Sequence, residues 1–130
     1  MRGTLVLDSA GLSGYIEGSR KVMLLIDAAH EEDRGLVISA ATIIEAQHAK
    51  VSTARMNWVL SRIRVEDVTK ESARAAAALL KEADLHGHRC AIDAMVAEAA
   101  LRQPRPVALI TSDPDDMSRL CGRSVDLVAV

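Results

Sequence analysis

Four acidic residues stand where carboxylates could take part in catalysis. Asp8 and Asp113 closely follow apolar runs, Glu45 lies in the segment after another run, and Asp93 lies in the first turn of a helix expected over 91–102. Each run is expected to be a buried strand, and the crevice of an open parallel sheet lies beyond the carboxyl ends of its strands. The four carboxylates are therefore expected to meet at one edge, which is costly unless a cation neutralises them.

The ligand chemistry of such a pocket is that of a hard cation. Carboxylates without Cys or clustered His suit Mg²⁺ or Mn²⁺. A metal of this kind polarises a phosphoryl oxygen and generates hydroxide from bound water, so phosphodiester hydrolysis is the expected reaction. Glycoside hydrolysis also uses paired carboxylates, but its sugar groove is usually lined by aromatic residues, which make up only 2% of this chain.

Each acid also has a purely structural interpretation as a helix cap. Thr42 and Glu45 have the spacing of a capping box, in which Glu45 returns a hydrogen bond to the backbone of Thr42. Asp113, followed by proline and two further acids, is typical of a helix start. Asp8 and Asp93 could be caps as well. The functional interpretation depends on all four acids meeting in one place.

The elements that must position these acids alternate along the chain. Strands are expected at 5–7, 36–38, 63–68, 107–110 and 125–128. Helices are expected after the first strand and over 21–30, 40–51, 53–61, 70–85, 91–102 and 114–120, with Thr69 as an N-cap and Gly87 ending the helix over 70–85. Alternation requires crossover connections, which predicts a three-layer α/β/α fold with a mostly parallel central sheet. With no repeat or linker, residues 1–130 are expected to form a single domain.

Composition narrows the function classes. The chain has 130 residues, of which 49% are hydrophobic and none is Phe, so the core must be aliphatic and aromatic platforms for stacking RNA bases are missing. The formal net charge is −2, and Cys90 and Cys121 are interpreted as reduced structural thiols. No signal peptide or membrane-spanning stretch is evident, so a soluble cytoplasmic protein is expected.

Several other polar residues have alternative interpretations. The pair in His86-Gly87-His88 is expected to lie in a solvated loop rather than to bind a metal. His48 could reach the rim of the pocket, although an exposed position is favoured. Glu98 is five residues after Asp93, about 140° around a helix, and should not face the same site. Arg102 and Arg105 are expected to cap their helix end rather than to bind RNA phosphate.

The chain resembles the PIN-domain ribonucleases and, within them, the VapC-type toxins of bacterial toxin–antitoxin pairs. The resemblance spans essentially the whole chain, and the segments around Asp93 and Asp113 are its most specific parts. Two departures stand out: the family often has Asn where Asp113 stands and an aromatic residue where Met117 stands. The matching segments are Leu5-Val6-Leu7-Asp8-Ser9, Ile38-Ser39 with Thr42 and Glu45, Ile92 to Ala100, and Thr111 to Met117.

This resemblance implies a PIN-like fold, a metal site and partners. It implies Asp8, Glu45, Asp93 and Asp113 as catalytic residues, with Asp8, Asp93 and Asp113 as ligands of Mg²⁺ or Mn²⁺. A supporting role for orienting these acids falls to Ser9, Thr42, Thr111 and Asp116. It also implies an RNA substrate cut to 5′-phosphate and 3′-hydroxyl ends, a cognate antitoxin that places a cation among the acids, and a homodimer.

Two other functions remain open. A receiver-type phospho-acceptor domain would also be α/β with an Asp at a strand end, but Asp8 is solitary and no Lys follows Ile110. A PIN-like scaffold that only binds a partner is the non-enzymatic alternative. The charge is compatible with a nuclease, because setting aside the four acids leaves 16 bases against 18 − 4 = 14 acids.

Overall fold

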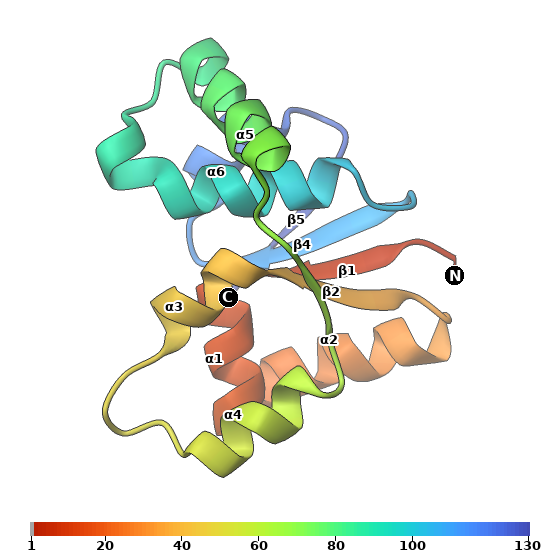
Figure 1. Cartoon of the computed structure of the whole chain (residues 1–130). Coiled ribbons are helices and arrows are strands. Elements are labelled where there is room, and N and C mark those ends of the chain that lie inside the picture. The colour runs from red at the N-terminus through yellow and green to blue at the C-terminus, as the bar shows by residue number, and fades with distance from the viewer. Residues whose placement is uncertain (1) are drawn as a thin grey trace.

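The computed structural model describes residues 2–130, which form a parallel β-sheet between two layers of helices (Figure 1). The strand order is β3-β2-β1-β4-β5, and every neighbouring pair is parallel. The expected three-layer α/β/α fold is confirmed. The strands are β1 (Thr4–Leu7), β2 (Gly35–Ser39), β3 (Arg64–Glu66), β4 (Val107–Thr111) and β5 (Asp126–Ala129). The helices of the described part are α1 (Ser9–Glu17), α2 (Arg20–Glu31), α3 (Ala40–Ala46), α4 (Thr53–Leu60), α5 (Lys70–Ala83), α6 (Gly87–Leu101) and α7 (Pro114–Cys121).

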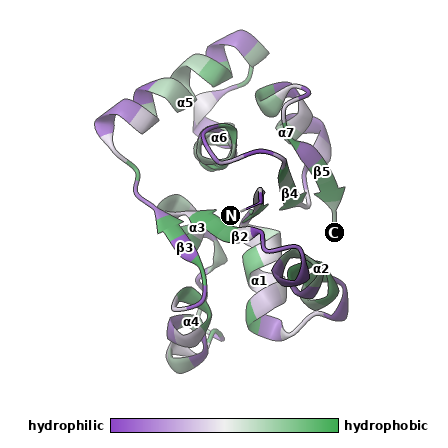
Figure 2. Cartoon of the chain, turned by 90° about the vertical axis from the view of Figure 1, so that its right-hand side faces the viewer, coloured by the Kyte–Doolittle hydropathy of each residue, from purple (hydrophilic) through white to green (hydrophobic). Residues whose placement is uncertain are grey.

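Alternation along the strands divides the core into two halves. Leu5 and Leu7 of β1 pack into the cluster on the side of α1 and α2, whereas Val6 packs into the cluster on the side of α6 and α7. Successive side chains of a strand point to opposite faces, so a strand covered on both faces must be apolar throughout. Figure 2 shows this pattern, with β2 and β4 mainly hydrophobic and α5 alternating between hydrophilic and hydrophobic residues.

Close packing of α6 on the sheet depends on small residues. Ala94, Ala97 and Ala100 recur every three residues on one face of the helix, and all three are fully buried in the cluster on that side of the sheet. Their short side chains let the helix axis approach the strands. The N-terminal part of α6 is thereby held at the edge where β1 and β4 end.

Several predicted boundaries were wrong. The helix after β2 ends at Ala46 rather than near residue 51, and the strand expected over 63–68 pairs only over Arg64–Glu66. Gly87 does not end α5. Asp84 does so in a left-handed conformation (φ 54°), and Gly87 begins α6 instead. Thr69 caps α5 as predicted, accepting a hydrogen bond from the Ser72 amide.

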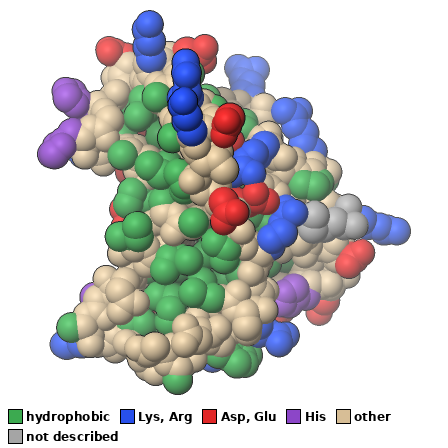
Figure 3. Space-filling view, in the orientation of Figure 1, with side chains coloured by type: hydrophobic (Ala, Val, Ile, Leu, Met, Phe, Trp, Pro, Cys, Tyr) green, Lys and Arg blue, Asp and Glu red, His purple; other side chains and the backbone are tan. Residues whose placement is uncertain are grey.

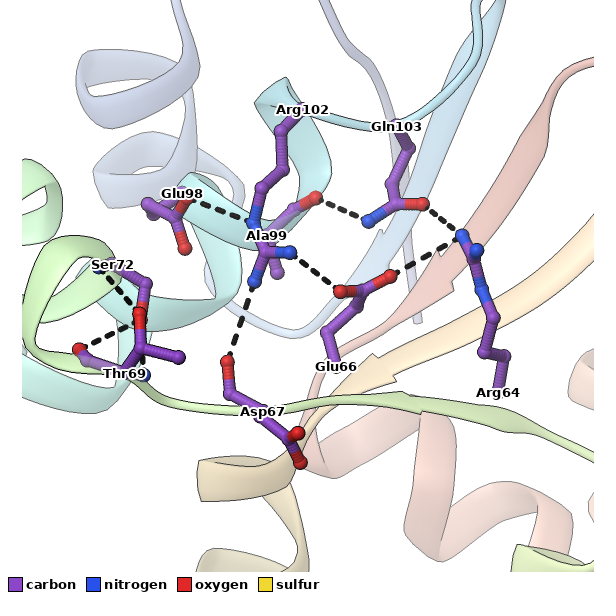
Figure 4. Close-up of polar contacts among 9 residues, drawn as sticks. All are labelled: Arg64, Glu66, Asp67, Thr69, Ser72, Glu98, Ala99, Arg102 and Gln103. Carbon is purple, nitrogen blue, oxygen red and sulfur yellow. Dashed lines mark hydrogen bonds and ion pairs between the residues drawn. The ribbon is translucent and has the colours of Figure 1, made fainter.

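The edge strand β3 is fixed to the end of α6 by an ionic cluster (Figure 4). Arg102 donates to Glu98 on its own helix and to Glu66 on β3, and Arg64 donates to Gln103. Burial opposes ionisation of Glu66, but its hydrogen bonds and the charges of the two arginines outweigh this and lower the pKa of the carboxyl. Arg102 is the C-cap residue of α6, as expected, and its guanidinium binds Glu98 in the last turn of that helix as well as Glu66. Glu98 faces away from the acid edge, as predicted.

Within residues 2–130, no helix is both long and apolar enough to cross a bilayer.

Candidate active site

Asp8 joins the ends of two neighbouring strands. It follows β1 directly and caps α1, where its Oδ1 accepts a hydrogen bond from the Gly11 amide at 3.1 Å. Its Oδ2 accepts a second one, from the Ser112 amide just after β4, at 3.2 Å. The side chain is buried, and each oxygen keeps a further lone pair for a ligand. The predicted cap and the predicted site residue are therefore the same carboxylate.

Asp93 and Asp113 come together from α6 and from the loop after β4. Asp113 occupies the N-cap position of α7, but its side chain makes no capping hydrogen bond. Its amide donates to Thr111 Oγ1 at 2.9 Å, which fixes the loop before α7. Carboxylate oxygens of Asp93, Asp113 and Asp116 all lie within 4.8 Å of one another. This compact group contains Asp116 besides the two expected ligands Asp93 and Asp113, and the third expected ligand, Asp8, lines the same cavity.

The acids surround a cavity of about 390 Å³ at the carboxyl edge of the sheet. Figure 3 shows the hollow between the tip of α6 and α3, with acidic side chains visible at its edge. Larger cavities lie at the ionic cluster of β3 and beside α3, but neither is lined by these converging acids. The lining residues of the acidic cavity are Asp8, Ser9, Glu45, His88, Arg89, Ala91, Ile92, Asp93, Ser112 and Asp113.

The crowding of carboxylates in this cavity changes the pKa of Asp93. Burial, a hydrogen bond with Asp113 and the negative charges of Asp113, Glu45 and Asp8 raise the pKa of Asp93 to about 7. Crowded carboxylates of this kind retain a proton near neutral pH unless a cation takes its place. The donor set consists of carboxylate oxygens, which fits Mg²⁺ or Mn²⁺.

Glu45 does not cap a helix in the structure. The N-cap of α3 is Ser39, whose Oγ accepts a hydrogen bond from the Ala41 amide at 3.2 Å. The capping-box interpretation of Thr42 and Glu45 was therefore wrong, and Glu45 lies exposed at the cavity. Thr42 is fully buried one turn earlier, and its hydroxyl has no hydrogen-bond partner within residues 2–130.

Sequence reasoning missed Arg89 at the cavity and wrongly expected His88 in a loop, whereas His48 is exposed as favoured. His88 and Arg89 line the cavity from the first turn of α6, before a kink at Cys90 (φ −110°, ψ 15°). Contact with Cys90, followed by the charges of Asp116 and Asp113, raises the pKa of Arg89. Arg89 precedes both the helix expected over 91–102 and the kink at Cys90, so helical periodicity carried no signal for its place at the cavity. His48 lines a different cavity, beside α1 and α4.

Two solved structures share this architecture over nearly the whole chain. A chain from the crystal structure of VapBC2 from Rickettsia felis, bound to a promoter DNA fragment, matches with a TM-score of 0.71 at 15% identity, covering 98% of both chains. The chain therefore has the three-layer PIN-like fold that the sequence predicted. A chain from a toxin–antitoxin complex of Klebsiella pneumoniae matches with a TM-score of 0.70 at 20% identity, covering 94% of this chain and 95% of the other.

No family model matches this sequence, and no curated protein matches it either. The resemblance to VapC-type PIN domains is therefore confirmed at the level of the fold.

Proposed function

We propose that this protein is a metal-dependent ribonuclease toxin of a type II toxin–antitoxin pair, acting as one nuclease domain over residues 1–130. The observation that carries the proposal is the convergence of Asp93, Asp113 and Asp116 at a cavity that Asp8 and Glu45 also border. The fold supports it, because two solved structures that share it come from toxin–antitoxin complexes.

The residues of the cavity divide the chemical work. Asp8, Asp93 and Asp113 would hold Mg²⁺ or Mn²⁺, which when bound supplies Lewis-acid polarisation and a water of lowered pKa. Glu45 is exposed at the cavity and is free to accept a proton from the attacking water. In-line attack on the RNA phosphate would leave 5′-phosphate and 3′-hydroxyl ends.

Four neighbouring residues support these acids. The Thr111 hydroxyl accepts a hydrogen bond from the Asp113 amide, and Asp116 belongs to the compact group with Asp93 and Asp113. Ser9 borders the cavity beside Asp8, and Thr42 is buried one turn before Glu45. Residues that hold the orientation of metal ligands typically contribute 10-fold or more to affinity or activity.

The proposal of an antitoxin partner rests on the two toxin–antitoxin structures that share this fold and on one apolar groove. An apolar groove of about 710 Å³ borders the acidic cavity and shares Ile92 with it. Figure 3 shows hydrophobic side chains gathered there, between α3 and the pair α5 and α6. We propose a cytoplasmic homodimer held inactive by a cognate antitoxin, whose apolar segment would suit this groove.

Cleavage of RNA in the presence of Mn²⁺ tests the proposal. The wild type should cut a single-stranded RNA only with added metal, and Asp93→Asn should abolish cutting while circular dichroism shows a preserved fold. Mn²⁺ at 100 times its Kd should stabilise the wild type by about 2.7 kcal/mol, and the variant should lose most of this stabilisation. Full activity of the variant would contradict the proposal. Metal-induced stabilisation without cleavage of any RNA would favour the scaffold.

A further inference from the structure

Arg89 lies on the wall of the acidic cavity, in the short turn of α6 that precedes the kink at Cys90. Its side chain is fully exposed. Among the described residues that line this cavity, Arg89 is the one with a permanent positive charge, and His88 beside it is the one imidazole. The cavity therefore has an acidic floor and a single cationic position on its wall.

The backbone fixes where this cation stands. The amides of Arg89 and Cys90 both donate to the carbonyl of His86, at 3.2 and 2.9 Å. Cys90 is buried beneath them and anchors the turn to the body of the protein. The Cα of Arg89 is thus held firmly, while its exposed side chain remains free to meet a ligand.

The Arg89 guanidinium interacts electrostatically with Asp113 and Asp116 but forms no ion pair with them. Contact with Cys90 and, after it, the charges of Asp116 and Asp113 favour its protonated form and raise its pKa. Within residues 2–130, however, no carboxylate oxygen lies within 4.0 Å of its nitrogens. Its five N–H donors are therefore not committed to a carboxylate.

A nucleic acid that enters this cavity faces an electrostatic problem. Its phosphates are repelled by the carboxylates that border the site, and one or two divalent ions offset only part of this charge. A guanidinium on the wall offers a planar fork of donors that matches two oxygens of a phosphate.

We propose that Arg89 binds a backbone phosphate of the RNA strand and so positions the strand over the acids. This inference rests on the proposed ribonuclease function and adds a substrate-binding residue to it. Arg89 acts on binding and placement of the strand, while the acids carry the chemistry.

The salt dependence of RNA binding tests the inference. A short fluorescein-labelled oligoribonucleotide is titrated with protein by fluorescence anisotropy at several KCl concentrations, with Ca²⁺ in place of Mg²⁺ and a gel to show that the strand stays intact. Arg89→Gln should weaken binding about tenfold, as expected for loss of a charge-assisted hydrogen bond. It should also reduce the slope of log K against log salt by about 0.7, the value for one lost phosphate contact on a single strand.

A matched control removes the same charge elsewhere. Arg123 is exposed in the connection between α7 and β5, at the opposite end of α7 from Asp116, and makes no ion pair in the described part of the chain. Arg123→Gln should leave both affinity and slope at the wild-type values. Arg89→Lys should keep the slope but recover only part of the affinity, because an ammonium lacks the planar fork.

The outcomes separate this inference from the proposed function. If Arg89 only neutralises Asp113 and Asp116, Arg89→Gln will change the affinity for Mn²⁺ but leave the salt slope unchanged, which overturns the inference even if the wild type cleaves RNA. If the slope depends on Arg89 but no RNA is cleaved with Mn²⁺, the inference stands and the ribonuclease function fails. In cleavage assays, Arg89→Gln should raise KM about tenfold with little change in kcat.

Discussion

The carboxylate of Asp8 accepts a hydrogen bond from the amide of Ser112, with 3.2 Å between Oδ2 and the nitrogen. The two residues follow β1 and β4, which are neighbours in the sheet with Leu7 paired to Ile110. A site carboxylate is thus also the link between two strand ends. Asp8 is oriented by hydrogen bonds to both of its oxygens, which makes it part of the stability of the fold and suits the role of metal ligand that we propose for it.

Asp8→Asn should therefore lower stability as well as activity. The amide has one oxygen, so the variant keeps one acceptor and turns an NH₂ group toward the other backbone donor, at Gly11 or Ser112. A buried unsatisfied donor costs about 1–3 kcal/mol, so urea unfolding should show a loss of this size together with loss of cleavage. An unchanged free energy of unfolding would show that these two hydrogen bonds contribute nothing.

Asp93→Asn should have the opposite effect on stability. Without metal, at about pH 8, the Asp93 carboxylate is half-buried among three other acids. The neutral amide removes that repulsion and can donate to Asp113, so the metal-free variant should be more stable than the wild type by about 1 kcal/mol after allowance for solvent screening. Comparison of urea midpoints at constant m-value measures this. Equal or lower stability of the variant would contradict the crowding of these charges.

The stability of the metal-free protein should depend on pH through Asp93. Its pKa rises from 3.8 to about 7 on folding, so between these values the folded protein holds a proton that the unfolded chain releases. The contribution of Asp93 is complete below its unfolded pKa and is lost as the pH rises through about 7. The Tm of the wild type should fall between about pH 5 and pH 8 more steeply than that of Asp93→Asn. Added Mn²⁺ should reverse this trend, because metal binding displaces the proton.

The ionic cluster of β3 should matter for stability but not for cleavage. Glu66→Gln removes the acid that joins Arg64 and Arg102, and should cost about 1–2 kcal/mol of unfolding free energy while kcat stays at the wild-type value. Glu82→Gln, an exposed position on α5 without an ion pair in the described part of the chain, serves as the control. A large fall in kcat for Glu66→Gln would show that edge strand β3 helps to shape the acid site.

Local sequence patterns were sufficient to predict a feature where it depends on a single helix or strand. Residue type and spacing predict the apolar strands, the Thr69 cap and the small-residue face of α6. Each of these features depends only on residues that are close together in the sequence. Predictions of helix boundaries were wrong where two residues close together could each end the helix. Gly87 is a common residue at a helix end, but Asp84 ended α5 three residues earlier because the chain turns there to begin α6.

The sequence by itself determined the kind of fold, and it placed Asp8, Asp93 and Asp113 at the ends of elements that meet at one edge of the sheet. Only the tertiary structure decided that Asp116, rather than Asp8, completes the compact acid group with Asp93 and Asp113. It also decided that Arg89 shares their cavity. The physical reason is that these relations depend on how α6 kinks at Cys90 and how the loop after β4 is held by Asp8 and Thr111. Both depend on contacts between segments about 100 residues apart or on backbone angles, and neither leaves a periodic pattern in the chain.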